Sequence, residues 1–178
     1  MTLHLFNTES SSFVKDLHML SLRAADDRRT IGKSYTKGAM AVCVSDNPEI
    51  GIDLEEKKAR APETIEHFIK KFSTFQIIDA QKTTDIQWFY RAWTAMESYF
   101  KLSGTGFGTP KDFTIDMQRQ SVLRDGEEVA WFEYFDMGAF LICLCSSTRF
   151  LKQDVQLNYH GWEDCDEKIR SGVFGSRL

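Results

Sequence analysis

The stretch "GAMAVCVS", from Gly38 to Ser45, has a close echo in "GAFLICLCS", from Gly138 to Ser146. Each copy starts with Gly-Ala, continues as an apolar run and carries a cysteine at its sixth position. Buried strands draw on a small apolar alphabet, so chance similarity is one interpretation. The other is a structural repeat. A repeat predicts an α+β fold of two similar α/β lobes with antiparallel sheets and packed helices, related by a pseudo-twofold axis.

Around this echo, three segments have apolar residues at helical spacing. They cover 12–25, the stretch that follows Pro62, and 87–104. Proline suits the first turn of a helix and glycine suits a helix end, so Pro62 and Gly104 mark two of the boundaries.

Short apolar runs predict the strands. We expect 39–45 and 49–54 to form two antiparallel strands joined by a brief turn, after a polar loop over 26–38. Further strands are expected over 112–117, 128–135 and 139–147. The segment after Phe150 is weakly patterned, so we expect it to be irregular or partly helical.

Composition restricts the class of protein. Hydrophobic residues make up 42% and charged residues 27% of the 178 residues, which favours a packed interior. The net charge of −4 disfavours a general nucleic-acid binder, and no run of about 18 apolar residues predicts a membrane span. The four cysteines have no metal-binding spacing, and the first residues do not resemble a secretory signal. We therefore expect a cytoplasmic protein with reduced thiols.

Two acidic residues stand out in the run "GIDLEE". Asp53 and Glu55 are two positions apart on a predicted strand, so their side chains point to the same face. Carboxylates that share a face repel each other unless a cation, a proton or solvent separates them. Mg²⁺ is a suitable cation because it prefers oxygen ligands. The alternative is a strand that simply ends in solvent.

A second charged pair lies in "WTAMESYFK". Glu97 and Lys101 are one helical turn apart, which is also the spacing of an ordinary surface ion pair worth a few tenths of a kcal/mol. The pair becomes a site only if it converges with Asp53 and Glu55. Three carboxylates around one point would then bind Mg²⁺, and the lysine would neutralise phosphate charge.

The segments "GIDLE" (51–55) and "WTAMESYFKLSGTGF" (93–107) together resemble the 4′-phosphopantetheinyl transferase superfamily, in particular its Sfp-type branch. The similarity extends over 34–147. It implies Mg²⁺-dependent transfer of the 4′-phosphopantetheine group from coenzyme A to a serine of an acyl or peptidyl carrier protein, with release of 3′,5′-ADP.

The resemblance assigns roles to the four charged residues. Asp53 and Glu97 would bind Mg²⁺, with Glu55 as a third ligand or a water-mediated partner. Glu97 would also activate the serine hydroxyl of the carrier, and Lys101 would contact the coenzyme A phosphates and assist the leaving group.

The sequence departs from the family pattern at several positions. Met96 replaces a lysine, and Thr36 stands where a histidine is expected. Lys37 and Lys33 are candidates, with Thr36, for binding coenzyme A. Fifty residues precede Gly51, about half of what the Sfp-type branch carries.

We therefore expect a shortened N-terminal lobe over 1–52, a C-terminal lobe with the catalytic helix over 53–150, and a tail over 151–178. The resemblance implies coenzyme A and a carrier protein as partners, with no nucleic acid and no membrane, and the two lobes favour a monomer. Two alternatives remain open. One is a catalytically degenerate homologue that only binds a carrier or another partner, and the other is a different Mg²⁺-dependent enzyme that acts on a phosphate ester.

Overall fold

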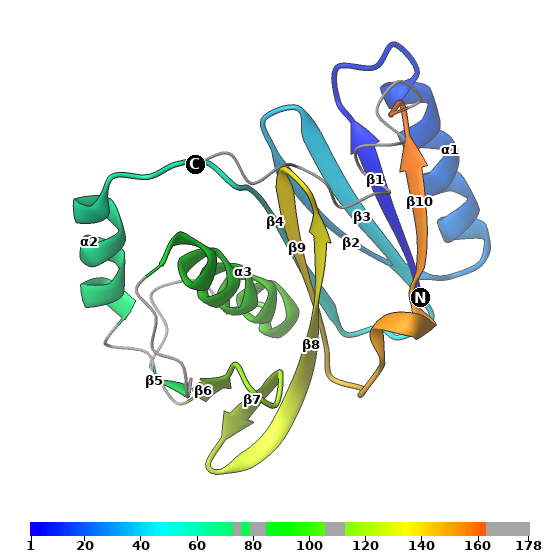
Figure 1. Ribbon diagram of the computed structural model, residues 1–178. Helices are drawn as coiled ribbons and strands as arrows, with labels where there is room; N and C mark the ends of the chain where they lie inside the picture. The colour runs from blue at the N-terminus through cyan, green and yellow to red at the C-terminus, as the bar shows by residue number, and fades with distance from the viewer. Residues whose placement is uncertain (73–75, 79–84, 106–112, 163–178) are drawn as a thin grey trace.

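The computed structural model describes residues 1–72, 76–78, 85–105 and 113–162, which form two β-sheets and three α-helices (Figure 1). The strand order is β10-β1-β3-β2 in the first sheet and β4-β9-β8-β7-β6-β5 in the second. The chain is therefore an α+β protein with two sheets, as the sequence predicts. Within the described residues, no helix is both long and apolar enough to cross a membrane.

The first sheet consists of β1 (Thr2–Asn7), β2 (Thr30–Thr36), β3 (Ala39–Ser45) and β10 (Gln156–His160). Strand β3 is antiparallel to β1 and β2, and β10 runs parallel to β1. Helix α1 (Phe13–Asp26) packs Leu17 and Leu20 against Phe6 and Val42 of this sheet. The predicted helix over 12–25 is thus confirmed.

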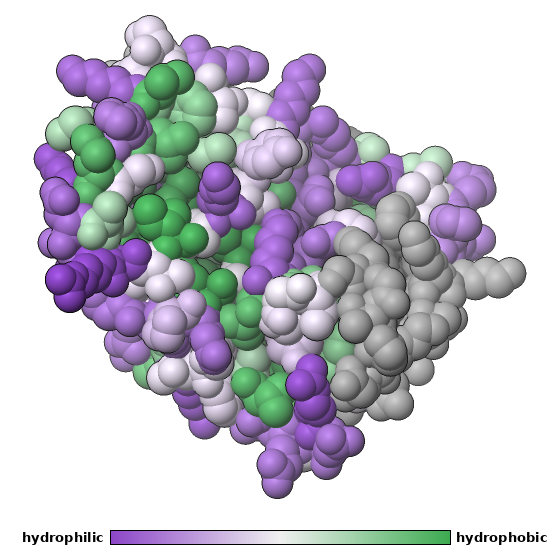
Figure 2. All heavy atoms as spheres, turned by 180° about the vertical axis from the view of Figure 1, so that it is seen from behind, coloured by the Kyte–Doolittle hydropathy of each residue, from purple (hydrophilic) through white to green (hydrophobic). Residues whose placement is uncertain are grey.

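The outer side of α1 retains apolar side chains. Val14 is 75% exposed, and Met19 and Leu22 are also uncovered. Figure 2 shows hydrophobic side chains gathered at the end of the molecule that holds α1 and the first sheet. The helix therefore buries one apolar side and leaves part of another in solvent.

The second sheet consists of β4 (Ile50–Glu56), β5 (Gln76–Ile78), β6 (Phe113–Asp116), β7 (Ser121–Arg124), β8 (Glu127–Met137) and β9 (Phe140–Ser146). Helices α2 (Pro62–Phe72) and α3 (Ile86–Ser103) accompany it. Both helices were predicted, and the left-handed φ of +66° at Gly104 ends α3 as expected. Phe89, Met96 and Phe100 of α3 are buried in the core beneath this sheet.

The two sheets share part of their topology. The order β1-β3-β2 corresponds to β4-β9-β8, and all four of these neighbouring pairs are antiparallel. Along the chain, α1 lies between β1 and β2 in one set, and α3 lies between β4 and β8 in the other, together with α2 and the strands β5, β6 and β7. The echoed stretches lie at the same place in both sets, since they form β3 and β9.

The sheets meet along β2 and β4. Leu5 of β1, Ile52 of β4 and Ile142 of β9 belong to one buried cluster between them. At Gly32 a Cβ atom would lie 3.3 Å from side-chain atoms of Ile50 and Ile52, so the small residue lets β2 approach β4 closely. This approach brings residues from the first sheet to the face of the second.

Several sequence predictions need correction. Both sheets are mixed rather than purely antiparallel, because β10 runs parallel to β1 and β5 runs parallel to β6. The segment predicted as a polar loop contains strand β2, whose alternating exposed residues face solvent at the edge of the sheet. Strands β3 and β4 exist but do not pair with each other, because β3 joins the first sheet and β4 pairs with β9. The segment after Phe150 contains the short 3₁₀ helix η1 (Lys152–Asp154), which the expectation of a partly helical segment allows, but also strand β10, which pairs with β1. Strands β1, β5 and β7 were not predicted.

The cysteines that the structure describes lie in its core. Cys43, Cys143 and Cys145 are free and buried. Burial raises the pKa of the Cys43 thiol to about 12, so this thiol stays protonated. Cys165 lies outside the described residues.

Candidate functional site

Strand β4 lies directly against helix α3, and Gly51 makes this possible. A Cβ atom at Gly51 would lie 1.9 Å from the carbonyl oxygen of Ser98 and 2.6 Å from the amide nitrogen of Leu102. Side chains on a strand alternate between its faces, so Asp53 and Glu55 point to the same side as Gly51. The motif therefore directs both carboxylates towards α3.

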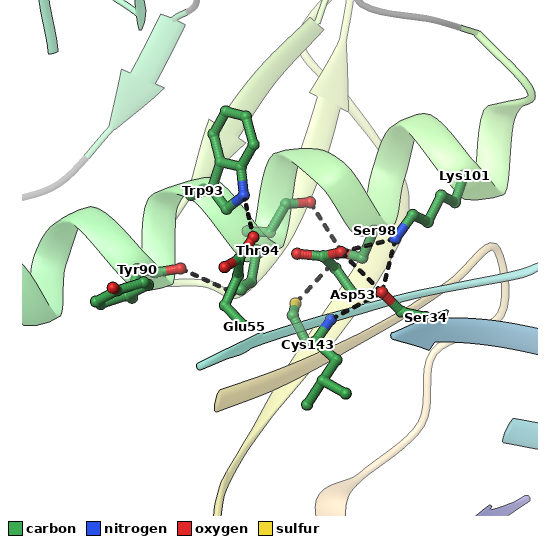
Figure 3. A network of polar contacts seen from close by, with 11 residues as sticks. Ser34, Asp53, Glu55, Tyr90, Trp93, Thr94, Ser98, Lys101 and Cys143 are labelled. Carbon is green, nitrogen blue, oxygen red and sulfur yellow. Dashed lines mark hydrogen bonds and ion pairs between the residues drawn. The ribbon is translucent and has the colours of Figure 1, made fainter. Parts of the chain in front are cut away.

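Asp53 lies at the centre of the site and is only 5% exposed. Its Oδ1 atom accepts hydrogen bonds from Lys101 Nζ at 2.7 Å and from the Ser34 hydroxyl at 3.1 Å (Figure 3). The Ser34 oxygen in turn accepts from Lys101 Nζ at 3.0 Å and from the backbone N–H of Leu54 at 3.2 Å. Strands β2 and β4 and helix α3 thus meet at one carboxylate oxygen.

The other oxygen of Asp53, Oδ2, has a different environment. It is buried and has no hydrogen-bond partner among the described residues. Such an atom is unusual, because a carboxylate oxygen loses its hydration on burial and needs a compensating partner. A cation at Oδ2 would supply that partner.

Glu97 lies on α3, half-buried, one turn before Lys101. Burial, followed by the negative charge of Asp53, raises the pKa of Glu97 to about 7, while Lys101 lowers it and Glu55 adds a smaller upward effect. The four charged groups are therefore close enough to act on one another. The Glu97 side chain makes no hydrogen bond or ion pair within the part of the chain that the structure describes, so its carboxylate is available to bind a ligand or a proton.

Glu55 is held by aromatic and cationic neighbours. Its Oε1 atom accepts a hydrogen bond from the indole N–H of Trp93 at 2.9 Å, and the Arg60 guanidinium lies 4.0 Å from Oε2. Burial raises the pKa of Glu55, and the Trp93 hydrogen bond opposes this effect. Arg60 is itself positioned by Tyr90, whose hydroxyl accepts from Arg60 Nε at 3.0 Å and whose ring lies 5.4 Å from the guanidinium carbon.

The carboxylates of Asp53, Glu55 and Glu97 suit a divalent cation, although they are not arranged as a closed metal site. Among the described residues, no three histidine, cysteine, aspartate or glutamate side chains are grouped so as to hold a metal ion. Asp53 is engaged by Lys101, and Glu55 by Trp93. Nevertheless, the carboxylate oxygens of Asp53, Glu55 and Glu97 are the ligand type that Mg²⁺ prefers, and Oδ2 of Asp53 lacks a hydrogen bond from the described residues. The residues present therefore fit such an ion chemically.

Three predicted residues of β2 and its turn form no hydrogen bond or ion pair with this cluster in the described structure. Lys33 is exposed and alternates with Ser34, so it projects from the opposite face of β2. Thr36 is half-buried and shares the face of Ser34, and Lys37 is exposed in the turn. The structure thus unites the charged residues of β4 and α3 and leaves these three outside.

Ser34 is a site residue that the sequence analysis did not identify, because it lies in a segment predicted as a loop. The sequence nevertheless contains a weak pattern that could have indicated it. Gly32, Ser34 and Thr36 alternate with the longer side chains of Ile31, Lys33 and Tyr35. Small residues on one face of a strand permit close approach of another element, and here that element is β4.

Comparison with known proteins adds an independent observation. The family model of the 4′-phosphopantetheinyl transferase superfamily matches residues 49–153. The protein named 4′-phosphopantetheinyl transferase Sfp from Bacillus subtilis (strain 168) is 24% identical over 126 residues, which cover 67% of this chain and 56% of that protein. A 4′-phosphopantetheinyl transferase from Bacillus subtilis is 34% identical over 107 residues, which cover 56% and 46%. The chain spans about half the length of these curated relatives.

Proposed function

The chain belongs to the 4′-phosphopantetheinyl transferase superfamily, and on this premise we propose that it transfers the 4′-phosphopantetheine group of coenzyme A to a serine of an acyl or peptidyl carrier protein. The serine oxygen attacks the β-phosphorus of coenzyme A. A new P–O bond to the serine forms, the bond to the bridging oxygen breaks, and 3′,5′-ADP leaves.

One observation carries this proposal. The charged residues of two motifs that are about 40 positions apart meet at one place, because Lys101 Nζ of the second motif lies 2.7 Å from the Oδ1 atom of buried Asp53 in the first. If Glu97 and Lys101 formed an ordinary surface ion pair, neither would need to lie beside a buried aspartate. Phosphoryl transfer depends mainly on positioning and on neutralising oxygen charge, and this cluster offers both.

Each residue has a proposed role in the step. Glu97 accepts the proton of the attacking serine hydroxyl, because its carboxylate is available and lies next to the other charged groups. The Lys101 side chain is 37% exposed, so its ammonium group can reach a substrate phosphate from its place beside Asp53. It neutralises the charge that develops on the bridging oxygen as this oxygen leaves with the 5′-phosphate of 3′,5′-ADP.

Asp53, Glu55 and Glu97 would hold Mg²⁺. When bound, the ion polarises the phosphate oxygens and stabilises the charge of the transition state. Trp93 keeps Glu55 oriented towards the site through its indole N–H.

The substrates contact further residues in this proposal. We assign Thr36 and Lys37, together with Lys101, to coenzyme A; Lys33 projects from the opposite face of β2 and is left out of this assignment. Two lysines after β4 already have partners, since Lys57 pairs with Asp136 and Lys58 pairs with Glu56, at 2.7 Å each, so we assign neither to carrier binding.

The proposal includes the organisation of the chain. We propose an N-terminal lobe (1–52), a C-terminal lobe (53–150) and a tail (151–178) that returns to the first sheet through β10. The shared strand order of the two sheets supports a pseudo-twofold relation between the lobes. We also propose that the protein acts as a monomer in the cytoplasm, for which the three free buried cysteines are favourable.

The test is intact-mass spectrometry of an apo carrier protein incubated with this protein, coenzyme A and Mg²⁺. We expect a mass increase of one phosphopantetheine group that disappears when EDTA is added. Several carrier types are tried in parallel, and a variant with Glu97→Gln serves as the matched control. An unchanged carrier mass in every reaction would refute the transfer activity.

One observation favours a second function, that of a carrier-binding protein without transfer. Met96 replaces the family's lysine and is fully buried in the core, so this position supplies no cation to the site. Carrier binding that is insensitive to Mg²⁺ and to Asp53→Ala, measured by calorimetry, would support this alternative. Mg²⁺-dependent binding of coenzyme A would exclude it.

A further inference from the structure

Ser34 occupies an unusual position in the site. It comes from β2 in the first sheet, is 5% exposed, and touches groups on β4 and α3. A serine hydroxyl has one donor and two acceptor positions. Ser34 uses all three, since it donates to Asp53 Oδ1 and accepts from Lys101 Nζ and from the backbone N–H of Leu54.

These hydrogen bonds divide the two oxygens of Asp53 into different roles. Oδ1 receives the Ser34 hydroxyl and the Lys101 ammonium group, while buried Oδ2 receives no hydrogen bond from the described residues. Two donors on one oxygen, fixed to two different elements, prevent the carboxylate from rotating to exchange its oxygens. The unpartnered oxygen is thereby kept in one place.

We propose that Ser34 is a positioning residue for divalent-cation binding: together with Lys101 it holds Oδ1 of Asp53, so that Oδ2 is presented to the cation. This inference rests on the proposed function, because that function supplies the reason for a divalent cation at this site. It assigns a role in the site to the first lobe, whose β2 otherwise contributes only candidate contacts to coenzyme A.

The alternative is that Ser34 merely satisfies the Leu54 amide and links the two sheets. The two roles predict different results. A linking role affects the stability of the fold, whereas a positioning role affects the affinity for a cation in protein that remains folded. The experiment therefore measures cation binding directly, independently of catalysis.

Mn²⁺ binding is titrated by electron paramagnetic resonance on the full chain, without coenzyme A or carrier, at a temperature where circular dichroism shows each variant to be folded. Ser34→Ala removes the hydroxyl, and Ser34→Thr retains it. Ser121→Ala is the matched control, because Ser121 is also a fully buried serine on a strand but its hydroxyl has no hydrogen-bond partner in the described part of the chain. If Ser34→Ala does not fold, Ser34→Cys takes its place, since a thiol preserves volume while bonding weakly.

We expect Ser34→Ala to weaken Mn²⁺ binding about 10- to 100-fold, as loss of groups that orient metal ligands generally does, and Ser34→Thr and Ser121→Ala to remain within about threefold of the wild type. Equal Mn²⁺ affinity in Ser34→Ala and the wild type would overturn the inference. So would equal losses in Ser34→Ala and Ser34→Thr, because the hydroxyl would then not be the cause.

The carrier assay separates this inference from the proposed function. If the wild type modifies a carrier and Ser34→Ala binds Mn²⁺ as tightly as the wild type, the proposed function is retained and the positioning role is refuted. A protein whose Mn²⁺ affinity depends on Ser34 but which modifies no carrier supports the positioning role and refutes the transfer. Absence of any Mn²⁺ binding by the wild type would overturn the inference and remove the cation from the proposed function.

Discussion

Substitution of Gly51 by alanine tests the contact on which the whole site is built. The added Cβ would lie 1.9 Å from the Ser98 carbonyl oxygen, and both this atom and the Leu102 nitrogen at 2.6 Å belong to the backbone of α3. Real Cβ atoms essentially never come closer than 3.0 Å to such atoms, so α3 and β4 must separate by about 1 Å. Overpacking generally costs about 1–3 kcal/mol, and a rigid helix backbone puts Gly51→Ala at about 3 kcal/mol.

For a chain of this length, about 3 kcal/mol corresponds to a melting temperature lowered by roughly 6–12 °C. Urea unfolding followed by circular dichroism measures the free energy of unfolding directly. The same shift moves Glu97 and Lys101 away from Asp53. A misplacement of about 1 Å can cost about 100-fold in rate, so carrier modification should fall by this factor in protein that is still folded.

Gly126→Ala is the control for Gly51→Ala. Gly126 has a φ of +84°, and a Cβ atom added to it would meet no heavy atom of the described residues within 4 Å. Alanine there meets only the left-handed backbone penalty of about 1 kcal/mol. If Gly51→Ala loses no more stability than Gly126→Ala, the close approach of β4 and α3 is not what Gly51 provides.

Three further predictions concern single side chains. Glu97→Gln should reduce carrier modification by about 1000-fold with an unchanged circular dichroism spectrum, because it removes a proton acceptor and a cation ligand; unchanged turnover would contradict its role. Trp93→Phe should weaken Mn²⁺ binding about tenfold, because Glu55 loses the indole N–H that orients it, and a measured affinity equal to that of the wild type would show that this bond is dispensable. Burial, followed by the charge of His160, lowers the pKa of His4 to about 4, so His4 is neutral in the fold while its unfolded-state pKa is 6.5. The unfolded chain therefore binds more protons between about pH 6.5 and pH 4, and stability should decrease by up to about 3 kcal/mol as the pH falls through this window. Urea titrations of His4→Gln should lack this component, and identical pH profiles for the two proteins would refute it.

The parts of the site that the sequence predicts are those encoded by local periodicity. Asp53 and Glu55 share a face because a strand alternates, and Glu97 and Lys101 share a face because a helix turns about every 3.6 residues. Both relations hold in the structure, as do the bounds of α3 and its end at Gly104. Predicting these features requires no knowledge of which elements pack together.

The incorrect predictions concern strands, whose pairing depends on residues that are distant in the sequence. The runs that became β3 and β4 were recognised as strands, but their partners were not, since a short connector suits a hairpin as well as a passage between two sheets. Strand β10 pairs with β1 across more than 150 positions of sequence, and nothing local in its residues reveals that partner. Edge strand β2 resembles a loop because half of its residues face solvent.

The same distinction separates the chemistry of the site from its geometry. Carboxylates and a lysine are visible in the sequence, whereas the residues that bring them together are small. Gly32 lets β2 approach β4, Gly51 lets β4 approach α3, and Ser34 fills the space where the three meet. A small residue becomes informative only when its neighbour across the fold is known. It follows that Gly51→Ala and Ser34→Ala should impair the site although neither residue carries a charge.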